Sequence, residues 1–216
     1  MDYKQKYLKY KAKYLKLKGG DPPEETDFEN QAKFIKIGGG KQGTIYNLYG
    51  TNFAYKVFIG LTSTPKGAWS VRPKFSRFIG GQNYYGGFSI EQFKKSADNY
   101  KKASYLDLGP HFYKSYTFEK NIVEHGVILK HGVIVMDCIH GDTIKKLKDD
   151  DKINDRHHLR HPEIPRLPKK FTPEIQRRFD DLCNELNKNN LIITHEDHDD
   201  NFMVDRETGR VYGIDF

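Results

Sequence analysis

The residues with the clearest capacity for chemistry lie in the stretch 191–216, which reads LIITHEDHDDNFMVDRETGRVYGIDF. An apolar run leads into a cluster of acids and histidines that ends at Asn201. Two short apolar segments then flank a turn-forming stretch, and the second segment leads to Asp215. A side-chain amide and a carboxylate at the two ends of one hairpin can converge on a hard cation such as Mg²⁺. The carboxylates that precede the amide, Glu196 and Asp197, are placed to orient a hydroxyl nucleophile.

A second chemical feature is the glycine-rich stretch 34–58, FIKIGGGKQGTIYNLYGTNFAYKVF. Gly38, Gly40 and Gly43 satisfy the pattern GxGxxG, which allows a backbone to approach a phosphate closely because no Cβ intervenes. In a dinucleotide-binding turn the same pattern opens a helix. Here the apolar alternation continues as a strand and soon reaches Lys56. We therefore expect two strands joined by a glycine-rich turn, with Lys56 either close to a phosphate or as an ordinary strand lysine facing water.

Composition limits the class of protein. The chain has 216 residues, of which 37% are hydrophobic, including 14 Tyr and 14 Phe, which is typical of a globular protein with one two-lobed domain or two small ones. No apolar run approaches the ~20 residues of a membrane-spanning helix, and the basic N-terminus lacks the apolar stretch of a signal peptide. Cys138 and Cys183 show no metal-type spacing, which favours a reducing, intracellular compartment.

The positive charge is concentrated at the N-terminus. Residues 1–18 contain seven lysines and one aspartate, and so carry +6 of the total charge of +7. Tyrosines and a leucine repeat there at spacings of four and three, which predicts an amphipathic helix. Such a helix could pack on the rest of the chain or on a second copy, or contact an anionic membrane surface or nucleic acid. The segment resembles the leader found on many proteins of giant DNA viruses. Residues 19–25 (GGDPPEE) predict a linker, so 1–25 forms a leader and linker.

The elements that must position this chemistry lie between the two motifs. Residues 59–88 are rich in glycine, proline and aromatic residues and predict a long irregular insertion, with basic side chains that could contact an anionic partner. Residues 89–103 predict a helix that Ser89 caps and whose inward face includes Phe93. Glu91 lies in its first turn, where an acid also complements the helix dipole.

The next elements are three strand-like runs, at 111–118, 121–129 and 131–137. A helix should begin at Thr143. The charged, proline-containing stretch 149–170 predicts a solvated loop, and its three histidines lack the nearby cysteines of a common zinc site. A helix over 172–189, with Thr172 as its cap and Pro173 in its first turn, precedes the C-terminal motif.

In this order and at these spacings, the motifs over residues 34–216 resemble the protein-kinase-like superfamily, in its atypical, small-molecule-kinase branch. The resemblance implies an α+β, two-lobed protein-kinase-like fold. Its β-rich N-lobe would span 26–138, interrupted by the insertion at 59–88, and its helical C-lobe would span 139–216. Because the sequence stops at Phe216, before an activation segment, we expect a truncated C-lobe.

The same resemblance implies ATP and Mg²⁺ as cofactors, and transfer of the γ-phosphoryl group to a hydroxyl-bearing acceptor whose class stays open. Lys56 would hold phosphate and pair with Glu91, and the hinge after the last strand would face the adenine. The residues that the resemblance assigns to the nucleotide are Gly38, Gly40, Gly43, Lys56, Glu91, Asp137 and Ile139, and those assigned to the metal are Asn201 and Asp215.

The chain departs from the family pattern at the catalytic base. Kinase-like loops place an Asp five residues before the metal-binding Asn, and Glu196 stands there in this sequence. Aligning Asp197 with that position restores the Asp but shortens the loop by one residue. We favour Asp197, because a shorter loop is easier to accommodate than a longer side chain. The departure leaves a second interpretation open, a catalytically inactive pseudokinase that binds nucleotide and acts as an interaction module.

Two metal chemistries are alternatives for the histidines of the same loop. His195 and Asp197 would suit an iron-dependent oxygenase, but no histidine follows His198 to complete the triad. His195 and His198 could instead bind zinc together with Asp199 or Asp200. The water-activating geometry that a zinc enzyme requires is not evident in this pattern.

Overall fold

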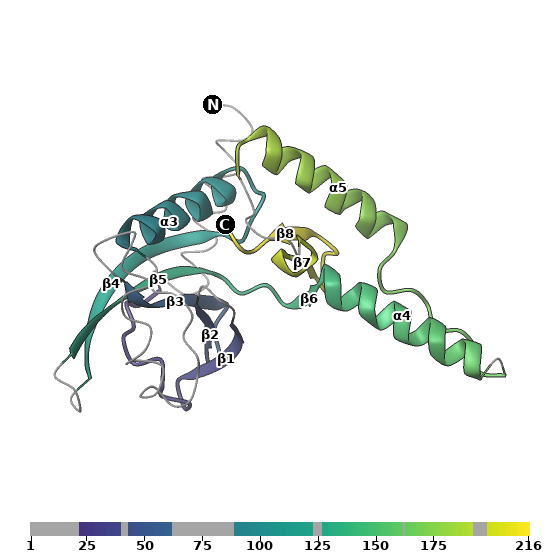
Figure 1. The fold of residues 1–216 in the computed structure, drawn as a ribbon, viewed down its shortest axis with the longest axis horizontal. Helices are drawn as coiled ribbons and strands as arrows, with labels where there is room; N and C mark the ends of the chain where they lie inside the picture. The colour runs from purple at the N-terminus through teal and green to yellow at the C-terminus, as the bar shows by residue number, and fades with distance from the viewer. Residues whose placement is uncertain (1–21, 40–42, 62–88, 123–126, 162, 192–197) are drawn as a thin grey trace. The chain divides into compact units, whose positions relative to one another are not determined.

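The computed structural model describes residues 22–39, 43–61, 89–122, 127–161, 163–191 and 198–216. The chain divides into two compact units. The first runs to Lys95 and includes Phe112–Asp137, and the second comprises Ser96–His111 and Cys138–Phe216. Strands dominate the first unit, whereas the second combines helices with a small sheet (Figure 1). The α+β class expected from the sequence is confirmed.

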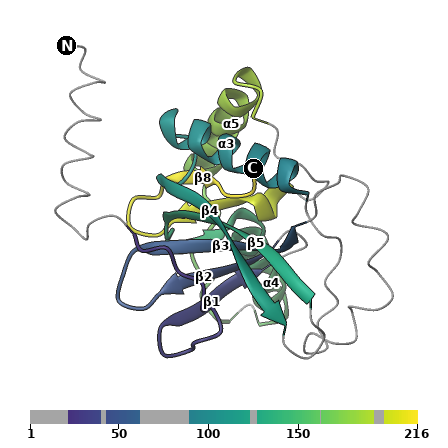
Figure 2. The ribbon, with the colours of Figure 1, turned by 90° about the vertical axis from the view of Figure 1, so that its left-hand side faces the viewer.

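The first unit is built on one antiparallel sheet with the strand order β1-β2-β3-β5-β4 (Figure 2). Its strands are β1 (Phe34–Gly39), β2 (Thr44–Leu48), β3 (Phe53–Leu61), β4 (Phe112–Ile122) and β5 (Val127–Asp137). The expected pair of strands around the glycine-rich turn is confirmed as the hairpin of β1 and β2. Strand β3 continues to Leu61, so the predicted insertion cannot begin at residue 59 as expected. Residues 62–88 lie outside the described residues.

The prediction of three strands between 111 and 137 is wrong, because β4 and β5 are two long strands. Polar pairs at 119–120 and 130–131 seemed to interrupt the apolar runs. In the sheet, Glu119 lies directly opposite Lys130, and Phe118 lies opposite His131. Opposite charges and aromatic rings on neighbouring strands stabilise each other, so both strands continue through these polar positions.

Helix α3 (Ile90–Tyr105) begins where the sequence predicts it. The Ser89 hydroxyl accepts a hydrogen bond from the Gln92 amide at 3.1 Å, and the Gln92 side chain accepts one from the Ser89 amide at 2.9 Å. This reciprocal arrangement is a capping box, which satisfies two amide groups that the helix leaves unpaired. Phe93 is buried against Phe58 of β3, with ring centroids 5.4 Å apart, and so fixes the first turns of α3 on one face of the sheet.

The opposite face of this sheet carries an aromatic cluster that the N-terminal part of the chain covers. Residues 22–30, the N-terminal strap, place Phe28 among the rings of Phe34, Tyr55 and Phe118 at centroid distances of 4.9–5.9 Å. The Tyr116 hydroxyl donates to the Glu25 carbonyl at 2.7 Å and accepts from the Glu25 amide at 2.8 Å. Burial raises the pKa of Tyr116 above its usual value, so the hydroxyl stays a donor.

The expectation that residues 19–25 form only a linker is therefore wrong for its described part. Pro22 is fully buried, and the Pro23 carbonyl accepts a hydrogen bond from Tyr55 at 3.2 Å. Prolines lack an amide donor, so this polar, proline-rich stretch leaves few backbone groups to satisfy when it packs on the sheet. Composition alone did not distinguish such a strap from a flexible connection.

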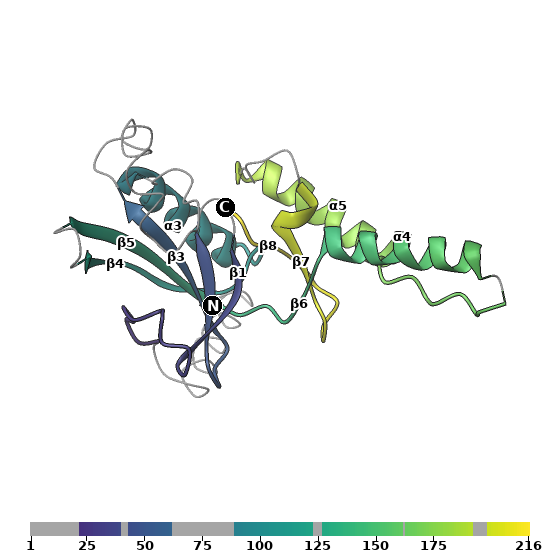
Figure 3. The same cartoon turned by 60° about the horizontal axis from the view of Figure 1, so that its bottom comes forward.

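The second unit has a small antiparallel sheet in the order β6-β7-β8, formed by Gly141–Thr143, Phe202–Asp205 and Val211–Gly213 (Figure 3). Helices α4 (Ile144–Arg160) and α5 (Pro173–Lys188) and the short helix η2 (His198–Asn201) accompany it. The predicted starts of both long helices are confirmed, since the hydroxyls of Thr143 and Thr172 each cap the first turn. In the described part of the chain, no helix has the length and apolarity needed to cross a bilayer.

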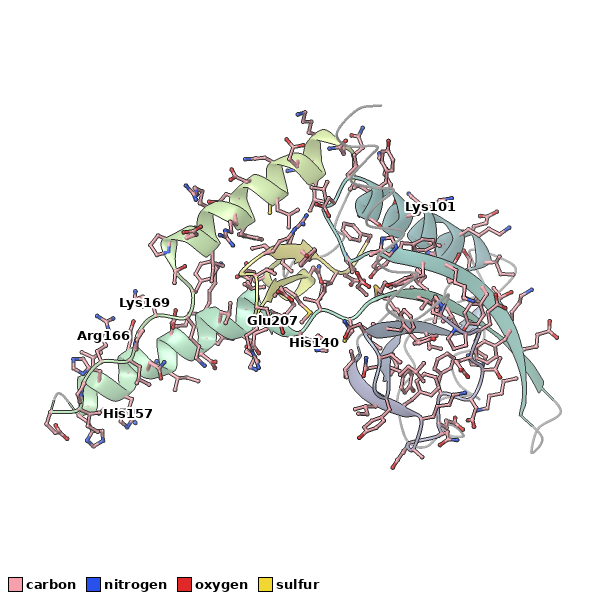
Figure 4. All side chains as sticks on the ribbon, turned by 180° about the vertical axis from the view of Figure 1, so that it is seen from behind. Lys101, His140, His157, Arg166, Lys169 and Glu207 are labelled. Atoms are coloured by element: carbon pink, nitrogen blue, oxygen red, sulfur yellow. The ribbon has the colours of Figure 1, made fainter. Side chains whose placement is uncertain are left out.

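The prediction of a solvated loop over 149–170 is wrong as far as Arg160, because α4 extends to that residue. Its acidic residues bind the segment that runs back along the helix (Figure 4). Asp155 pairs with Arg166, and the Asp151 carboxylate accepts from the amides of Lys170 and Phe171 at 2.8 and 2.9 Å. The charged residues that predicted a solvated loop thus form ion pairs and hydrogen bonds within the fold.

The burial of the strap predicts different melting temperatures for two N-terminal deletions. Removing residues 1–20 leaves every strap contact in place, and we expect an unchanged melting temperature. Removing residues 1–30 also takes away buried Phe28, a loss that typically costs about 3–5 kcal/mol, and should lower the melting temperature by about 10 °C. Differential scanning calorimetry of both deletions, with Phe28→Ala in the full chain as a matched variant, measures this. Equal melting temperatures for the two deletions would show that the strap does not belong to the core.

Candidate nucleotide and metal site

The β7–β8 hairpin brings together the two residues with the best metal-binding chemistry. Phe202 pairs with Gly213, and the Asn201 carbonyl accepts a hydrogen bond from the Ile214 amide at 2.9 Å. Asn201 therefore lies just before one strand, and Asp215 just beyond the other, at the same end of the hairpin. The sequence predicted that both residues lie at the ends of one hairpin, and that their side chains converge stays a prediction. Their role as metal ligands stays a prediction.

Asn201 is a buried amide with an unsatisfied atom. The residue is 9% exposed, and its Nδ2 has no hydrogen-bond partner within the described part of the chain. A buried N–H donor without a partner costs about 1–3 kcal/mol, so Nδ2 marks a place where an acceptor such as a phosphate oxygen can supply the missing hydrogen bond, whereas a metal would bind the amide oxygen. An amide and a carboxylate together provide the oxygen donors that Mg²⁺ prefers, with the remaining positions left for water and phosphate oxygens. The two side chains therefore fit a magnesium ion bound together with a nucleotide.

The two acids immediately before Asn201 have a different role. Asp199 pairs with Lys148 at 2.9 Å, and Asp200 pairs with Lys145 at 2.7 Å. The two lysines are three residues apart on α4 and so share one face of that helix. Lys148 also lies over the Phe171 ring, 4.8 Å from its centroid. Both carboxylates fasten η2 to α4, which argues against the alternative that they bind zinc with His198.

Sequence reasoning missed this contact between η2 and α4. The available signal was the pair of lysines at 145 and 148, but nothing local to the sequence shows that α4 lies beside the acidic cluster. Glu196 and Asp197, the two candidates for the catalytic base, fall in 192–197, outside the described residues. Gly40 also falls outside them. The assignments of these three residues stay predictions.

In the first unit, the register of the sheet aligns the glycine-rich strand with Lys56. Gly38 lies opposite Ile45, and Ile45 lies opposite Lys56 on the next strand. Lys56 is 4% exposed, and its Nζ lies 5.3 Å from the centroid of the Phe58 ring. The alternative of a strand lysine facing water is wrong. Lysines are rarely buried to this degree, and a buried cation on this strand is a strong candidate for binding an anion.

The two described glycines of the GxGxxG pattern differ in what surrounds them. A Cβ at Gly43 would come within 2.3 Å of the Val57 carbonyl oxygen, so the approach of β3 requires a glycine there. A Cβ at Gly38 would meet only the Ile45 side chain, at an ordinary distance of 3.8 Å. The fold therefore explains Gly43 but not Gly38. A ligand that approaches the backbone closely would explain Gly38.

The remaining predicted contacts lie at the end of β5 and the start of α3. Asp137 ends β5, and its carboxylate accepts a hydrogen bond from the Tyr113 hydroxyl at 2.7 Å. Ile139 follows in a non-helical segment and is partly buried. Glu91 is exposed in the first turn of α3. The adenine contacts of Asp137 and Ile139, and the pairing of Glu91 with Lys56, stay predictions.

Comparisons with known proteins find similarity at the level of structure. No protein-family model matches the chain, and no curated protein sequence does. The maize sucrose-induced receptor kinase 1 kinase domain, solved with AMP-PNP, matches over 90% of this chain and 54% of its own, with 12% identity and a TM-score of 0.44. The Legionella pneumophila effector kinase LegK7 matches over 97% of this chain and 35% of its own, with 13% identity and a TM-score of 0.38.

The pseudokinase PEAK1 matches over 98% of this chain and 50% of its own, with 11% identity and a TM-score of 0.35. The chain thus spans between 35% and 54% of these three proteins' chains. All three are kinase or pseudokinase structures. At identities of 11–13% and TM-scores of 0.35–0.44, they are too distant to assign a ligand or an activity to this chain.

The two glycines provide a matched test of the phosphate-binding turn. Gly43→Ala forces a side chain against the β3 backbone and should cost about 1–3 kcal/mol of unfolding free energy. Gly38→Ala should change that free energy by less than about 1 kcal/mol, because its surroundings accept a methyl group, yet it should weaken nucleotide binding. Urea denaturation and nucleotide titration of both variants measure the two effects. Unchanged nucleotide affinity in Gly38→Ala would remove this turn from the site.

Proposed function

We propose that this chain belongs to the protein-kinase-like fold, binds ATP together with Mg²⁺, and transfers the γ-phosphoryl group to a hydroxyl-bearing acceptor. The observation that carries the proposal is the position of Asn201 and Asp215 at one end of the β7–β8 hairpin, with a buried, unsatisfied amide between the acidic loop and the strand. The buried Lys56, in register with Gly38, supports a phosphate site in the first unit.

Each residue has a defined task in this proposal. The Asn201 amide oxygen and the Asp215 carboxylate would hold Mg²⁺, which neutralises charge on the phosphate oxygens when it is bound. The Lys56 ammonium and the glycine-rich backbone would hold the phosphates. Glu196 or Asp197 would orient the acceptor hydroxyl and take its proton. The acceptor oxygen forms a bond to the γ-phosphorus as the bond to the bridging oxygen of ADP breaks.

The ion pairs of two acids in this loop bear on which carboxylate could act as the catalytic base. Asp199 and Asp200 are already paired with Lys148 and Lys145, which leaves Glu196 and Asp197 as the carboxylates of this loop. A glutamate in the family's Asp position favours the second candidate, a pseudokinase that keeps nucleotide binding without transfer. The two functions share the nucleotide site and differ only in the need for a positioned base.

Binding should depend on the metal. In calorimetric titrations with a non-hydrolysable ATP analogue, we expect tighter binding in MgCl₂ than in EDTA, because the metal links phosphate to Asn201 and Asp215. Asp215→Asn should abolish this difference, whereas Glu207→Gln, an exposed acid in the turn at the far end of the same hairpin, should leave it unchanged. A folded protein without affinity for the nucleotide at millimolar concentrations would contradict both candidate functions.

The adjacent acids separate the enzyme from the pseudoenzyme. Neighbouring residues in an extended loop point in opposite directions, so only one of the two carboxylates can face the acceptor. Loss of a positioned base typically costs about 10²- to 10⁴-fold in rate, whereas loss of a solvated acid costs little. We expect Asp197→Asn to be the damaging change and Glu196→Gln to serve as its control, in single-turnover assays of phosphoryl transfer or ATP hydrolysis. Small and equal effects of both changes would leave the pseudokinase as the function.

A further inference from the structure

The middle of α3 contacts the residues on both sides of Asp215. The Ser96 hydroxyl donates a hydrogen bond to the main-chain oxygen of Phe216 at 2.6 Å. The Tyr100 hydroxyl donates one to the carbonyl of Ile214. Ser96 and Tyr100 are four residues apart and so lie on one face of the helix, directed at a single short stretch of chain.

The Ser96 hydrogen bond is buried and the Tyr100 hydrogen bond is partly buried, and packing reinforces both. Tyr100 is fully buried, and Ser96 is 6% exposed. The Tyr100 ring meets the Phe216 ring edge to face, with centroids 5.3 Å apart and planes at 86°. Aromatic pairs prefer this arrangement. Water competes poorly for hydrogen bonds in such a dry environment, so these bonds keep their geometry.

The stretch is also fixed by the loop that follows α3. The Gly213 amide donates to the Leu108 carbonyl at 3.1 Å, and Arg210 forms an ion pair with Asp107 at 2.7 Å. Arg210 additionally lies over the Tyr212 ring, 4.9 Å from its centroid. Residues 210–216 are therefore held along their length by α3 and residues 107–108, in addition to the hydrogen bonds of the hairpin itself.

These contacts determine how Asp215 is presented. The Ile214 carbonyl belongs to the planar peptide group that leads into Asp215, and Phe216 is the residue that leaves it. When the peptide group before a residue and the residue after it are both held, the direction of its Cα–Cβ bond is restricted. The hairpin bond from the Ile214 amide to the Asn201 carbonyl then sets this direction relative to Asn201.

We propose that Ser96 and Tyr100 are positioning residues that hold the Asp215 carboxylate in the orientation required for metal binding. The inference rests on the proposed Mg²⁺–nucleotide function and extends it to a helix that has no ligand of its own in the metal site. Residues that orient a metal ligand typically contribute about 10- to 100-fold in metal affinity. The two hydroxyls should therefore act on the metal-dependent part of nucleotide binding and leave the metal-free part unchanged.

The test compares nucleotide affinity with and without metal in the full chain. Tyr100→Phe keeps the ring that packs on Phe216 and removes only the hydroxyl, and Ser96→Ala removes the other. For both we expect the affinity for a non-hydrolysable ATP analogue in EDTA to stay within about twofold of the parent chain. The gain in affinity on adding MgCl₂ should fall by about tenfold. Ser96→Thr retains a hydroxyl and should keep the gain. Tyr105 is an exposed tyrosine of the same helix, and Tyr105→Phe should not alter the gain.

Three results would overturn the inference. If the parent chain binds the nucleotide equally in MgCl₂ and EDTA, the proposed function fails and the inference fails with it. If the parent shows the gain and both variants keep it in full, the positioning role alone is wrong. If the variants lose metal-free affinity and melting temperature in parallel with the gain, the hydroxyls serve general stability and do not orient Asp215.

Discussion

The pairing of β7 with β8 is the interaction on which the candidate site depends. It sets Phe202 against Gly213 and so brings Asn201 and the residues around Asp215 to one end of the hairpin. Among the described residues this sheet has three short strands, so the hairpin needs support from outside the sheet. The Phe202 ring meets Phe179 of α5 edge to face at 4.8 Å, and Arg178 donates to the Gly209 carbonyl at 2.7 Å.

Elements on several sides thus constrain the same short hairpin. Helix α5 contacts its first strand and its turn, α4 binds η2 through the Lys148–Asp199 and Lys145–Asp200 ion pairs, and α3 holds the residues beyond β8. Exposed ion pairs contribute little to stability individually. Here they position η2, and with it Asn201, against α4.

The first unit achieves rigidity by a different route, through aromatic packing. The N-terminal strap closes one face of its sheet, and even a polar residue on that face joins the cluster, since His131 stacks on Phe118 with centroids 5.0 Å apart. Burial, assisted by the nearby Lys120, lowers the pKa of His131 to about 4, so the ring is neutral at neutral pH and packs as an aromatic side chain. The other face carries Phe58, the start of α3 and the buried Lys56.

The sequence by itself determined the features that depend on neighbours in the chain: the β1–β2 and β7–β8 hairpins, the helix caps at Ser89 and Thr172, the helix start at Thr143, and the position of Asn201 and Asp215 at one end of the second hairpin. These follow from periodicity, turn residues and caps, which act over a few residues. Tertiary structure alone decided that the strap is buried, that α4 continues through its charged stretch, and that Ser96 contacts Phe216 across 120 residues of sequence. Each of these requires a distant partner to satisfy a buried or charged group, and local pattern carries no information about which segment that partner belongs to.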